Sequence, residues 1–212
     1  LPKQERPDLP WTPVKAKPAR DNFDSPTLGS EWYFVRIPQK AFHNLINSQL
    51  ALTLQPEIVD SLVNSAMIIQ KTRHHQFKAT TLLNFQTKKD NEQAGLILYR
   101  TANGYYSLLK DKSGIALIKK HLGKREIIEH IPYNKQEVFL SVAVNGTEIQ
   151  FSFGETQEHM TNIGSIQNVA PLSDNKFNKF NGTGVGVYAT SNGKQSRNKA
   201  LYDWFEYISD KN

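Results

Sequence analysis

The sequence predicts an all-β protein, a sandwich or jelly roll of short antiparallel strands. Apolar and polar side chains alternate with a period of two in segments such as 77–86, which is typical of strands with one buried face. Turn-forming pairs stand between such segments, at Asn103-Gly104 and Asn145-Gly146. About a dozen short strands of this kind follow residue 20, and a regular series of strands and turns favours a sandwich.

The first 20 residues differ from the rest because they hold five of the ten prolines. Proline lacks an amide hydrogen and fixes φ, so such a segment forms neither a helix nor a central strand. We expect residues 1–20 to form an extended linker and residues 21–212 to form the sandwich. Trp11 gains by burial, and we expect it to lie against a surface. Because the chain begins with Leu1 and not with Met, we expect a fragment or a processed product.

Individual segments after residue 20 predict different environments. Residues 56–66 (PEIVDSLVNSA) are the best helix candidate, with apolar residues at helical spacing. Residues 94–100 (AGLILYR) are apolar on both faces and should form a central strand. Residues 138–144 and 148–153 flank Asn145-Gly146, which predicts a hairpin with a type I′ turn.

Composition excludes several classes of function. The absence of cysteine excludes a disulfide scaffold and thiolate metal sites. It fits a bacterial protein but does not separate a cytoplasmic from a periplasmic or secreted location. No apolar run approaches ~18 residues, so we expect no membrane span. The net charge of +6 comes from scattered basic residues without a block of like charges, so we expect no nucleic-acid partner.

Two acidic residues near the C-terminus, Asp203 and Glu206, raise the question of glycoside hydrolysis. A glycosidase needs two carboxylates facing each other across the sugar, roughly 5 to 10 Å apart. On a regular strand, an odd spacing places side chains on opposite faces. We therefore expect Asp203 to share a face with Phe205 and Tyr207, and Glu206 to share the other face with Trp204. This spacing argues against a catalytic pair.

Other residue groups suggest binding, each beside a structural alternative. Asp21, Asp24 and Asp203 would supply oxygen ligands to a structural calcium if the first and last strands pair. The alternative is that Asp24-Ser25-Pro26 is a capped turn, and we expect no other cofactor.

Aromatic rings could form a sugar platform, because flat apolar faces stack on sugars as they bury other apolar surface. The alternative is that most of these rings belong to the core. The candidate rings are Trp32, Tyr106, Tyr188 and Trp204.

Three motifs in order resemble a known family. Residues 20–38 (RDNFDSPTLGSEWYFVRIP) resemble the opening of the C-terminal β-sandwich of family 43 glycoside hydrolases, the β-xylosidase and α-L-arabinofuranosidase group. Residues 92–108 (EQAGLILYRTANGYYSL) are similar to the family's next motif. The end of the chain, from FNGTGVGVYATSNGK at 180–194 to ALYDWFEY at 200–207, is similar to its last. The resemblance covers about residues 9 to 208.

The resemblance implies a concanavalin A-like jelly roll that is accessory to an N-terminal five-bladed β-propeller holding the catalytic carboxylates. Residues 1–20 then form the linker from a catalytic domain that is missing here. In this family a loop before the V-G-x-Y-A-T strand sends a Phe into the substrate pocket, and Phe180 stands at that position. Asn181 departs from the family's Thr after this Phe, and Phe177 is the alternative candidate for the contact.

Three functions follow from these expectations. In the first, the chain is a non-catalytic domain that closes the pocket of a xylosidase or arabinofuranosidase acting on xylo- or arabino-oligosaccharides. In the second, it is a free-standing carbohydrate-binding module for xylan or arabinan oligosaccharides, which requires an exposed aromatic row. In the third, it is a catalytic sandwich, which requires two convergent carboxylates, and the sequence offers no such pair.

Overall fold

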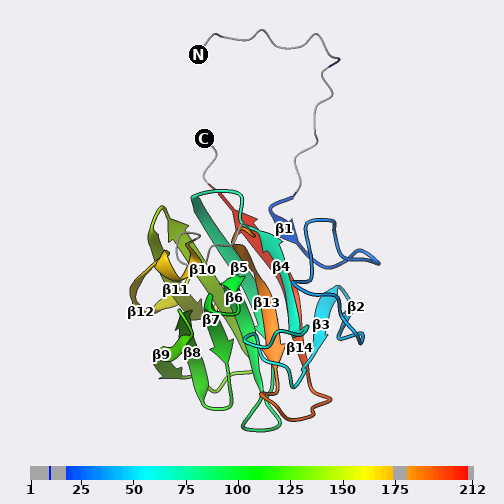
Figure 1. Ribbon diagram of the computed structural model, residues 1–212. Coiled ribbons are helices and arrows are strands. Elements are labelled where there is room, and N and C mark those ends of the chain that lie inside the picture. The colour runs from blue at the N-terminus through cyan, green and yellow to red at the C-terminus, as the bar shows by residue number, and fades with distance from the viewer. Residues whose placement is uncertain (1–9, 11–17, 174–180, 210–212) are drawn as a thin grey trace.

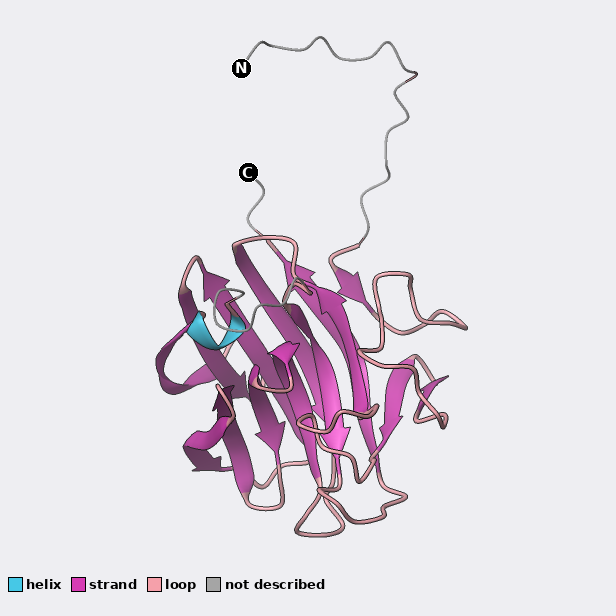
Figure 2. Cartoon of the chain, in the orientation of Figure 1, coloured by secondary structure: helices cyan, strands magenta, loops and turns pink. Residues whose placement is uncertain are grey.

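The computed structural model describes residue 10, residues 18–173 and residues 181–209. Two antiparallel sheets lie face to face, as Figures 1 and 2 show, and the predicted all-β sandwich is confirmed. The only helical element in these residues is one 3-10 turn, η1 (Ala170–Leu172). No helix in this part of the chain is long and apolar enough to cross a membrane.

The larger sheet has eight strands within the described residues, in the order β12-β11-β10-β5-β14-β3-β2, with β1 also paired to β14. The short β1 joins the last strand near the point where the described chain begins and ends (Figure 1). The strands of this sheet are β1 (Arg20–Asp21), β2 (His43–Ile46), β3 (Gln49–Thr53), β5 (Gln76–Asn84), β10 (Glu137–Asn145), β11 (Glu148–Gly154), β12 (Met160–Asn168) and β14 (Lys199–Ile208).

The smaller sheet has six strands in the same part of the chain, in the order β4-β13-β6-β7-β8-β9. Its third strand, β6, is fully buried along residues 94–100, so the prediction of a central strand there is confirmed. The strands are β4 (Ala66–Lys71), β6 (Gln93–Thr101), β7 (Gly104–Lys110), β8 (Gly114–His121), β9 (Lys124–Pro132) and β13 (Gly184–Thr190).

The main core lies between the sheets and follows the period of two. On β10, Val138, Leu140 and Val142 are fully buried, as alternate positions of a strand with one core face should be. Tyr202 of β14 crosses the core, and its hydroxyl lies 3.0 Å from the Gly95 carbonyl and 2.9 Å from the Tyr188 carbonyl of the facing sheet. Burial raises the pKa of Tyr202, because its ionised form would lose hydration.

The predicted hairpin of β10 and β11 is confirmed, but its turn differs in type. Asn145 pairs with Glu148, so Gly146 and Thr147 are the central residues. Only Gly146 has a positive φ, at 61°. A positive φ at the first central position alone is the pattern of a type II′ turn, whereas type I′ requires it at both.

The helix predicted at 56–66 is wrong. The segment between β3 and β4 consists of turns and bends and lies across the outer face of the six-stranded sheet. Val59 is buried there, and its amide donates to the Tyr188 hydroxyl at 3.0 Å. Tertiary contacts to the sheet replace the hydrogen bonds that a short helix would have made internally.

Candidate functional site

The loop predicted to enter a substrate pocket connects β12 and β13. Phe177 and Phe180 lie outside the described residues, which end at Ser173 after η1 and resume at Asn181. The candidate site is therefore formed by Asn181, at the C-terminal end of this loop, and by the residues that contact it. They come from β4, β6 and the start of β13.

Asn181 is fixed to the two strands that flank β13. Its amide Nδ2 donates to the Arg100 carbonyl at 2.9 Å, and its own carbonyl accepts from Lys71 Nζ at 2.5 Å. The backbone amide of Thr72 donates to the Thr183 carbonyl at 3.0 Å. Because β4 and β6 both pair with β13, this end of the loop rests on a rigid part of the sheet.

Lys71 and Arg100 make this end of the loop electropositive. Arg100 is only 2 % exposed, although it lies at the end of an apolar strand. Burial, together with the nearby charge of Arg100, lowers the pKa of Lys71, and burial lowers the pKa of Arg100. Lys71 Nζ also lies 5.0 Å from the centre of the Tyr33 ring. The Lys71 charge is directed at backbone carbonyl oxygens, because Nζ donates to those of Asn181 and Gly182.

Sequence reasoning missed this cluster, although the sequence holds one signal for it. Arg100 is a charged residue that directly follows a run of buried apolar residues, and a buried charge needs partners. Gly184 supports the same region, because a Cβ there would lie 2.8 Å from the Tyr33 hydroxyl and 2.6 Å from Ile69. A glycine without Cβ allows this close approach of side chains to the strand.

The carboxylates proposed as calcium ligands are engaged separately. Asp21 accepts hydrogen bonds from the Phe23 amide at 2.9 Å and from Trp32 Nε1 at 2.7 Å, one on each oxygen. Asp203 accepts from Gln49 Nε2 at 3.3 Å. Within the described ranges no three His, Asp or Glu side chains are grouped as metal ligands. The donor set as it stands does not fit calcium, and a calcium here stays a prediction.

The four rings proposed as sugar contacts are all buried. Trp32 and Trp204 are 8 % and 6 % exposed, and Tyr106 and Tyr188 are 1 % and 2 % exposed. Tyr106 belongs to the main core, and its hydroxyl donates to the Asn168 carbonyl at 2.9 Å. None of these rings presents an open face for stacking, and packing accounts for their positions. A sugar contact by any of them stays a prediction.

The prediction that Asp203 and Glu206 lie on opposite faces of the strand is wrong. The register of β14 against β5 shifts between Tyr202 and Trp204, which is the signature of a β-bulge. The extra residue reverses the alternation of inward and outward side chains along β14. Tyr202 faces the core before the bulge, and Phe205, three residues later, faces it after the bulge. The prediction that Asp203 shares a face with Phe205 and Tyr207 is therefore wrong.

Beyond the bulge, Trp204 and Glu206 share the outer face as predicted. The Arg20 guanidinium lies 3.9 Å from the centre of the Trp204 ring, and Arg20 Nε lies 3.1 Å from Glu206 Oε1. Asp203 is bonded to the side chain of Gln49, whose neighbour Leu50 faces the core. Each carboxylate thus has its own structural partner, and the pair forms part of a packed outer surface.

A second apolar cluster covers the outer face of the six-stranded sheet. The segment at 58–60 and Tyr33 lie over it, so Tyr99, Tyr105 and Tyr188 are buried on this face. Asp60 holds the covering segment in place, because it accepts from the Tyr105 hydroxyl and from Lys120 Nζ, each at 2.6 Å. This face therefore offers no exposed row of tyrosine rings.

Comparison with known families matches the same part of the chain that the sandwich occupies. Residues 20–208 match the family described as the beta xylosidase C-terminal concanavalin A-like domain. The non-reducing end alpha-L-arabinofuranosidase BoGH43B of Bacteroides ovatus is 30 % identical over 209 residues, which is 95 % of this chain and 39 % of that protein. A xylosidase/arabinosidase of Butyrivibrio fibrisolvens is 25 % identical over 191 residues, 86 % of this chain and 36 % of that protein.

Solved structures agree with these relatives. The K247S mutant of the GH43 protein BlXynB from Bacillus licheniformis superposes with a TM-score of 0.89 at 26 % identity, covering 97 % of this chain and 42 % of that one. GH43B of the Bacteroides ovatus xyloglucan locus gives a TM-score of 0.87 at 26 % identity, with coverages of 96 % and 41 %. The chain thus spans about two fifths of the length of these four relatives.

Proposed function

The chain belongs to the family of beta xylosidase C-terminal concanavalin A-like domains, and from this premise we propose that it is the non-catalytic partner of a glycoside hydrolase domain. It packs on a catalytic β-propeller of the same polypeptide and helps close the substrate pocket for xylo- or arabino-oligosaccharides. One observation carries the proposal. The family match fills residues 20–208, while the full-length relatives are more than twice as long.

The base of the β12–β13 loop supports pocket closure. A wall that shapes a pocket has to be held rigidly, because small displacements of a positioned substrate lower the rate strongly. Asn181 and Thr183 are tied to β4 and β6 through Lys71, Thr72 and Arg100. A loop that starts from this base can exclude water from a neighbouring pocket, which favours the chemistry inside it.

The second function, a free-standing carbohydrate-binding module, finds less support. Its recognition would rest on exposed rings, and the four candidate rings are at most 8 % exposed. The outer face of the six-stranded sheet is covered by the segment at 58–60. The catalytic reading is weakened as well, because Asp203 and Glu206 are bound to Gln49 and Arg20.

Hydrolysis and kinetics test the proposal. The 212-residue chain alone is expected to hydrolyse neither a p-nitrophenyl xyloside nor a p-nitrophenyl arabinofuranoside. In a polypeptide that joins the chain to a family 43 catalytic domain, Phe180→Ala should lower kcat/KM by roughly 10- to 100-fold, because the pocket loses a wall. Phe177→Ala identifies which of the two rings has this role.

A matched control separates this effect from general damage. Leu122→Ala removes a side chain that is 60 % exposed and belongs to the turn between β8 and β9, so it should leave kcat/KM unchanged. Wild-type kinetics in both Phe177→Ala and Phe180→Ala would refute pocket closure. Turnover by the isolated chain would refute the non-catalytic role.

A further inference from the structure

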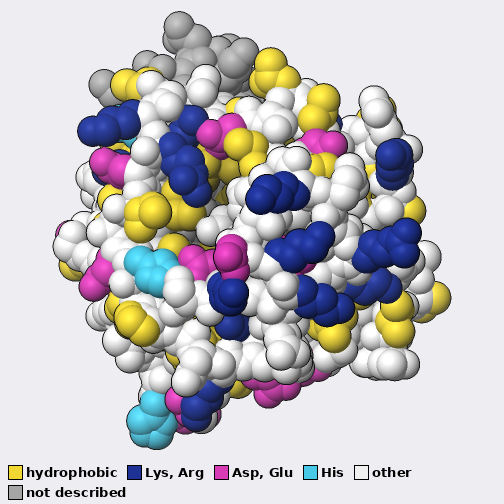
Figure 3. Space-filling view, turned by 90° about the horizontal axis from the view of Figure 1, so that it is seen from below, with side chains coloured by type: hydrophobic (Ala, Val, Ile, Leu, Met, Phe, Trp, Pro, Cys, Tyr) yellow, Lys and Arg dark blue, Asp and Glu magenta, His cyan; other side chains and the backbone are white. Residues whose placement is uncertain are grey.

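The end of the sandwich opposite β1 carries a concentration of positive charge. The connections β5–β6 (residues 85–92) and β13–β14 (residues 191–198) meet there, at the lower end of Figure 1. Figure 3 views this end directly and shows Lys and Arg side chains gathered on it. The first strand, β1, lies at the opposite end of the sandwich (Figure 1).

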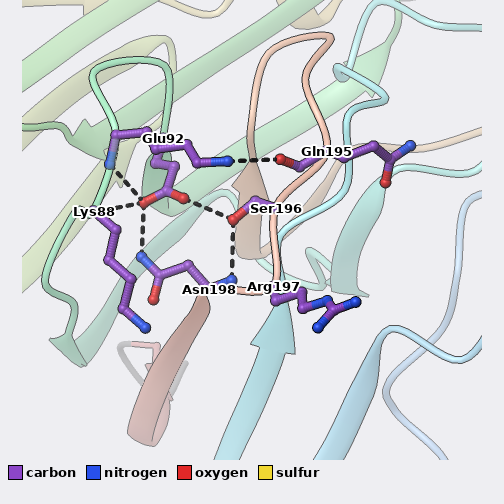
Figure 4. A pocket seen from close by; sticks show the side chains of 7 residues that line it. Lys88, Glu92, Gln195, Ser196, Arg197 and Asn198 are labelled. Atoms are coloured by element: carbon purple, nitrogen blue, oxygen red, sulfur yellow. Dashed lines mark hydrogen bonds between the residues drawn. The ribbon is translucent and has the colours of Figure 1, made fainter.

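A buried carboxylate, that of Glu92, forms hydrogen bonds with residues of both connections. Glu92 is 0 % exposed, and its oxygens accept from the Lys88 amide at 2.7 Å, Ser196 Oγ at 2.6 Å and Asn198 Nδ2 at 2.7 Å (Figure 4). Burial alone would raise the pKa of Glu92, but these hydrogen bonds outweigh it and lower the pKa. These hydrogen bonds fix the two connections, and with them their surface residues, relative to each other.

The cations of these connections line an open hollow of about 580 Å³. Lys88 and Arg197 reach away from Glu92 in Figure 4, and Lys89 Nζ donates to the Gln195 carbonyl at 3.1 Å. Glu92 is the one acid among the described residues of the lining, and its oxygens already accept hydrogen bonds. Among the described residues neither Lys88 nor Arg197 forms an ion pair, so their charges are available to a ligand.

A second hollow of about 330 Å³ meets the first at Gln195, which lines both. Its charged lining residues, Lys40 and Glu57, balance each other. Amide side chains donate and accept hydrogen bonds and so suit the hydroxyl groups of a sugar. The amides of this second hollow are Gln39, Gln55, Asn64 and Gln195.

We propose that this end of the sandwich binds an acidic polysaccharide, with a uronic acid carboxylate among Lys88, Lys89 and Arg197 and neutral sugar units beside Gln195. Arginine presents a planar pair of donors that matches a carboxylate, and lysine adds a point charge. The adjoining amides fit uncharged sugar units. This binding is independent of pocket closure and would anchor the protein to a charged, branched chain.

The distribution of charge favours this partner over a nucleic acid. A nucleic-acid strand carries a phosphate at every nucleotide, so a groove that follows it needs cations along its length. Among the described residues the excess of cations lines one hollow, and in the adjoining hollow Lys40 is balanced by Glu57. A chain with an occasional carboxylate and neutral units between matches this arrangement.

Calorimetric titration of the 212-residue chain tests the proposal. The probes are a glucuronic-acid-substituted xylo-oligosaccharide, the same oligosaccharide after reduction of its carboxyl group, and a single-stranded oligonucleotide of similar length. The acidic sugar should bind at least about tenfold more tightly than its reduced form, and added salt should weaken it. Lys88→Gln combined with Arg197→Gln should lower its affinity by about tenfold or more.

Two further variants sharpen the result. Lys78→Gln combined with Lys124→Gln removes the same charge from exposed positions elsewhere and should leave the affinity unchanged. Gln195→Ala should weaken both the acidic and the reduced sugar. The proposal is overturned if the two double variants lose affinity equally or if the acidic and reduced sugars bind equally well. It is also overturned if the oligonucleotide binds more tightly than the acidic sugar, or if the acidic sugar does not bind. None of these outcomes bears on Phe180, so the two proposals fail separately.

Discussion

The two apolar clusters of this sandwich are enclosed in different ways. The larger one lies between the sheets, where alternate residues of facing strands meet. The smaller one lies on the outer face of the six-stranded sheet and is closed by irregular segments around Tyr33 and Val59. The first depends on strand periodicity, and the second depends on a few polar contacts such as those of Asp60. We therefore expect the main core to be the more sensitive to loss of volume.

The largest effect is expected from a cavity in the main core. Phe151 is 0 % exposed and packs 5.6 Å from the Tyr106 ring, so Phe151→Ala should lower the free energy of unfolding by about 3–5 kcal/mol. Urea unfolding measures it. Phe139→Ala is the control, because Phe139 lies partly exposed against Trp204 on the outer face of the larger sheet. If Phe139→Ala lowered the free energy of unfolding as much as Phe151→Ala, the core between the sheets would be no more sensitive to loss of volume than the outer face.

In the second cluster, the buried Tyr188 should lower the free energy of unfolding at high pH. Burial raises the pKa of Tyr188 from 10.0 to about 12, so the folded state keeps a proton that the unfolded chain has released. The stabilisation is complete below pH 10 and is lost as the pH rises from 10 to 12, by on the order of 2–3 kcal/mol.

Tyr188→Phe checks this, because the variant cannot ionise at that position. Its free energy of unfolding should fall less steeply between pH 10 and 12 than that of the wild type, whatever its value at neutral pH. Equal slopes for the two proteins would show that Tyr188 does not stay protonated in the folded state. Tyrosinate absorbance followed in parallel reports the ionisation directly.

The smallest effect is expected from the polar contact that closes the second cluster. Asp60→Asn removes the charge that faces Lys120, whose side chain is 12 % exposed, and should lower the free energy of unfolding by about 1–2 kcal/mol. Asp90→Asn breaks an ion pair of the same 2.6 Å length between exposed side chains and should have no measurable effect. Equal results for both would mean that Asp60 does not hold the covering segment. Hydrogen exchange of residues 56–64 locates the change.

Much of the fold could be predicted from local pattern. The central strand at 94–100 and the hairpin around Gly146 follow from short-range chemistry, namely apolar continuity and a glycine that accepts positive φ. The family was identifiable from three motifs in order, and its match to residues 20–208 confirms it. The linker at 1–20 and the pocket role of Phe180 stay predictions.

What failed were the predictions that depended on long-range contacts. Residues 56–66 have helical spacing, but Val59 and Asp60 gain more from the sheet beneath them than a short helix would gain internally. The assignment of Asp203 to a strand face assumed a regular strand. The bulge beside it is visible only in the pairing of β14 with β5.

The amino-acid sequence by itself determined the all-β class, the central strands and the family, because these depend on alternation, turns and motifs that neighbouring residues specify. The tertiary structure alone decided which groups share a site. Arg100 and Lys71 meet at Asn181, and Glu92 joins two connections about a hundred residues apart, from Lys88 to Ser196. The physical reason is that a charge or a polar group is satisfied by whatever the fold brings within hydrogen-bond distance, and local sequence does not encode that distance.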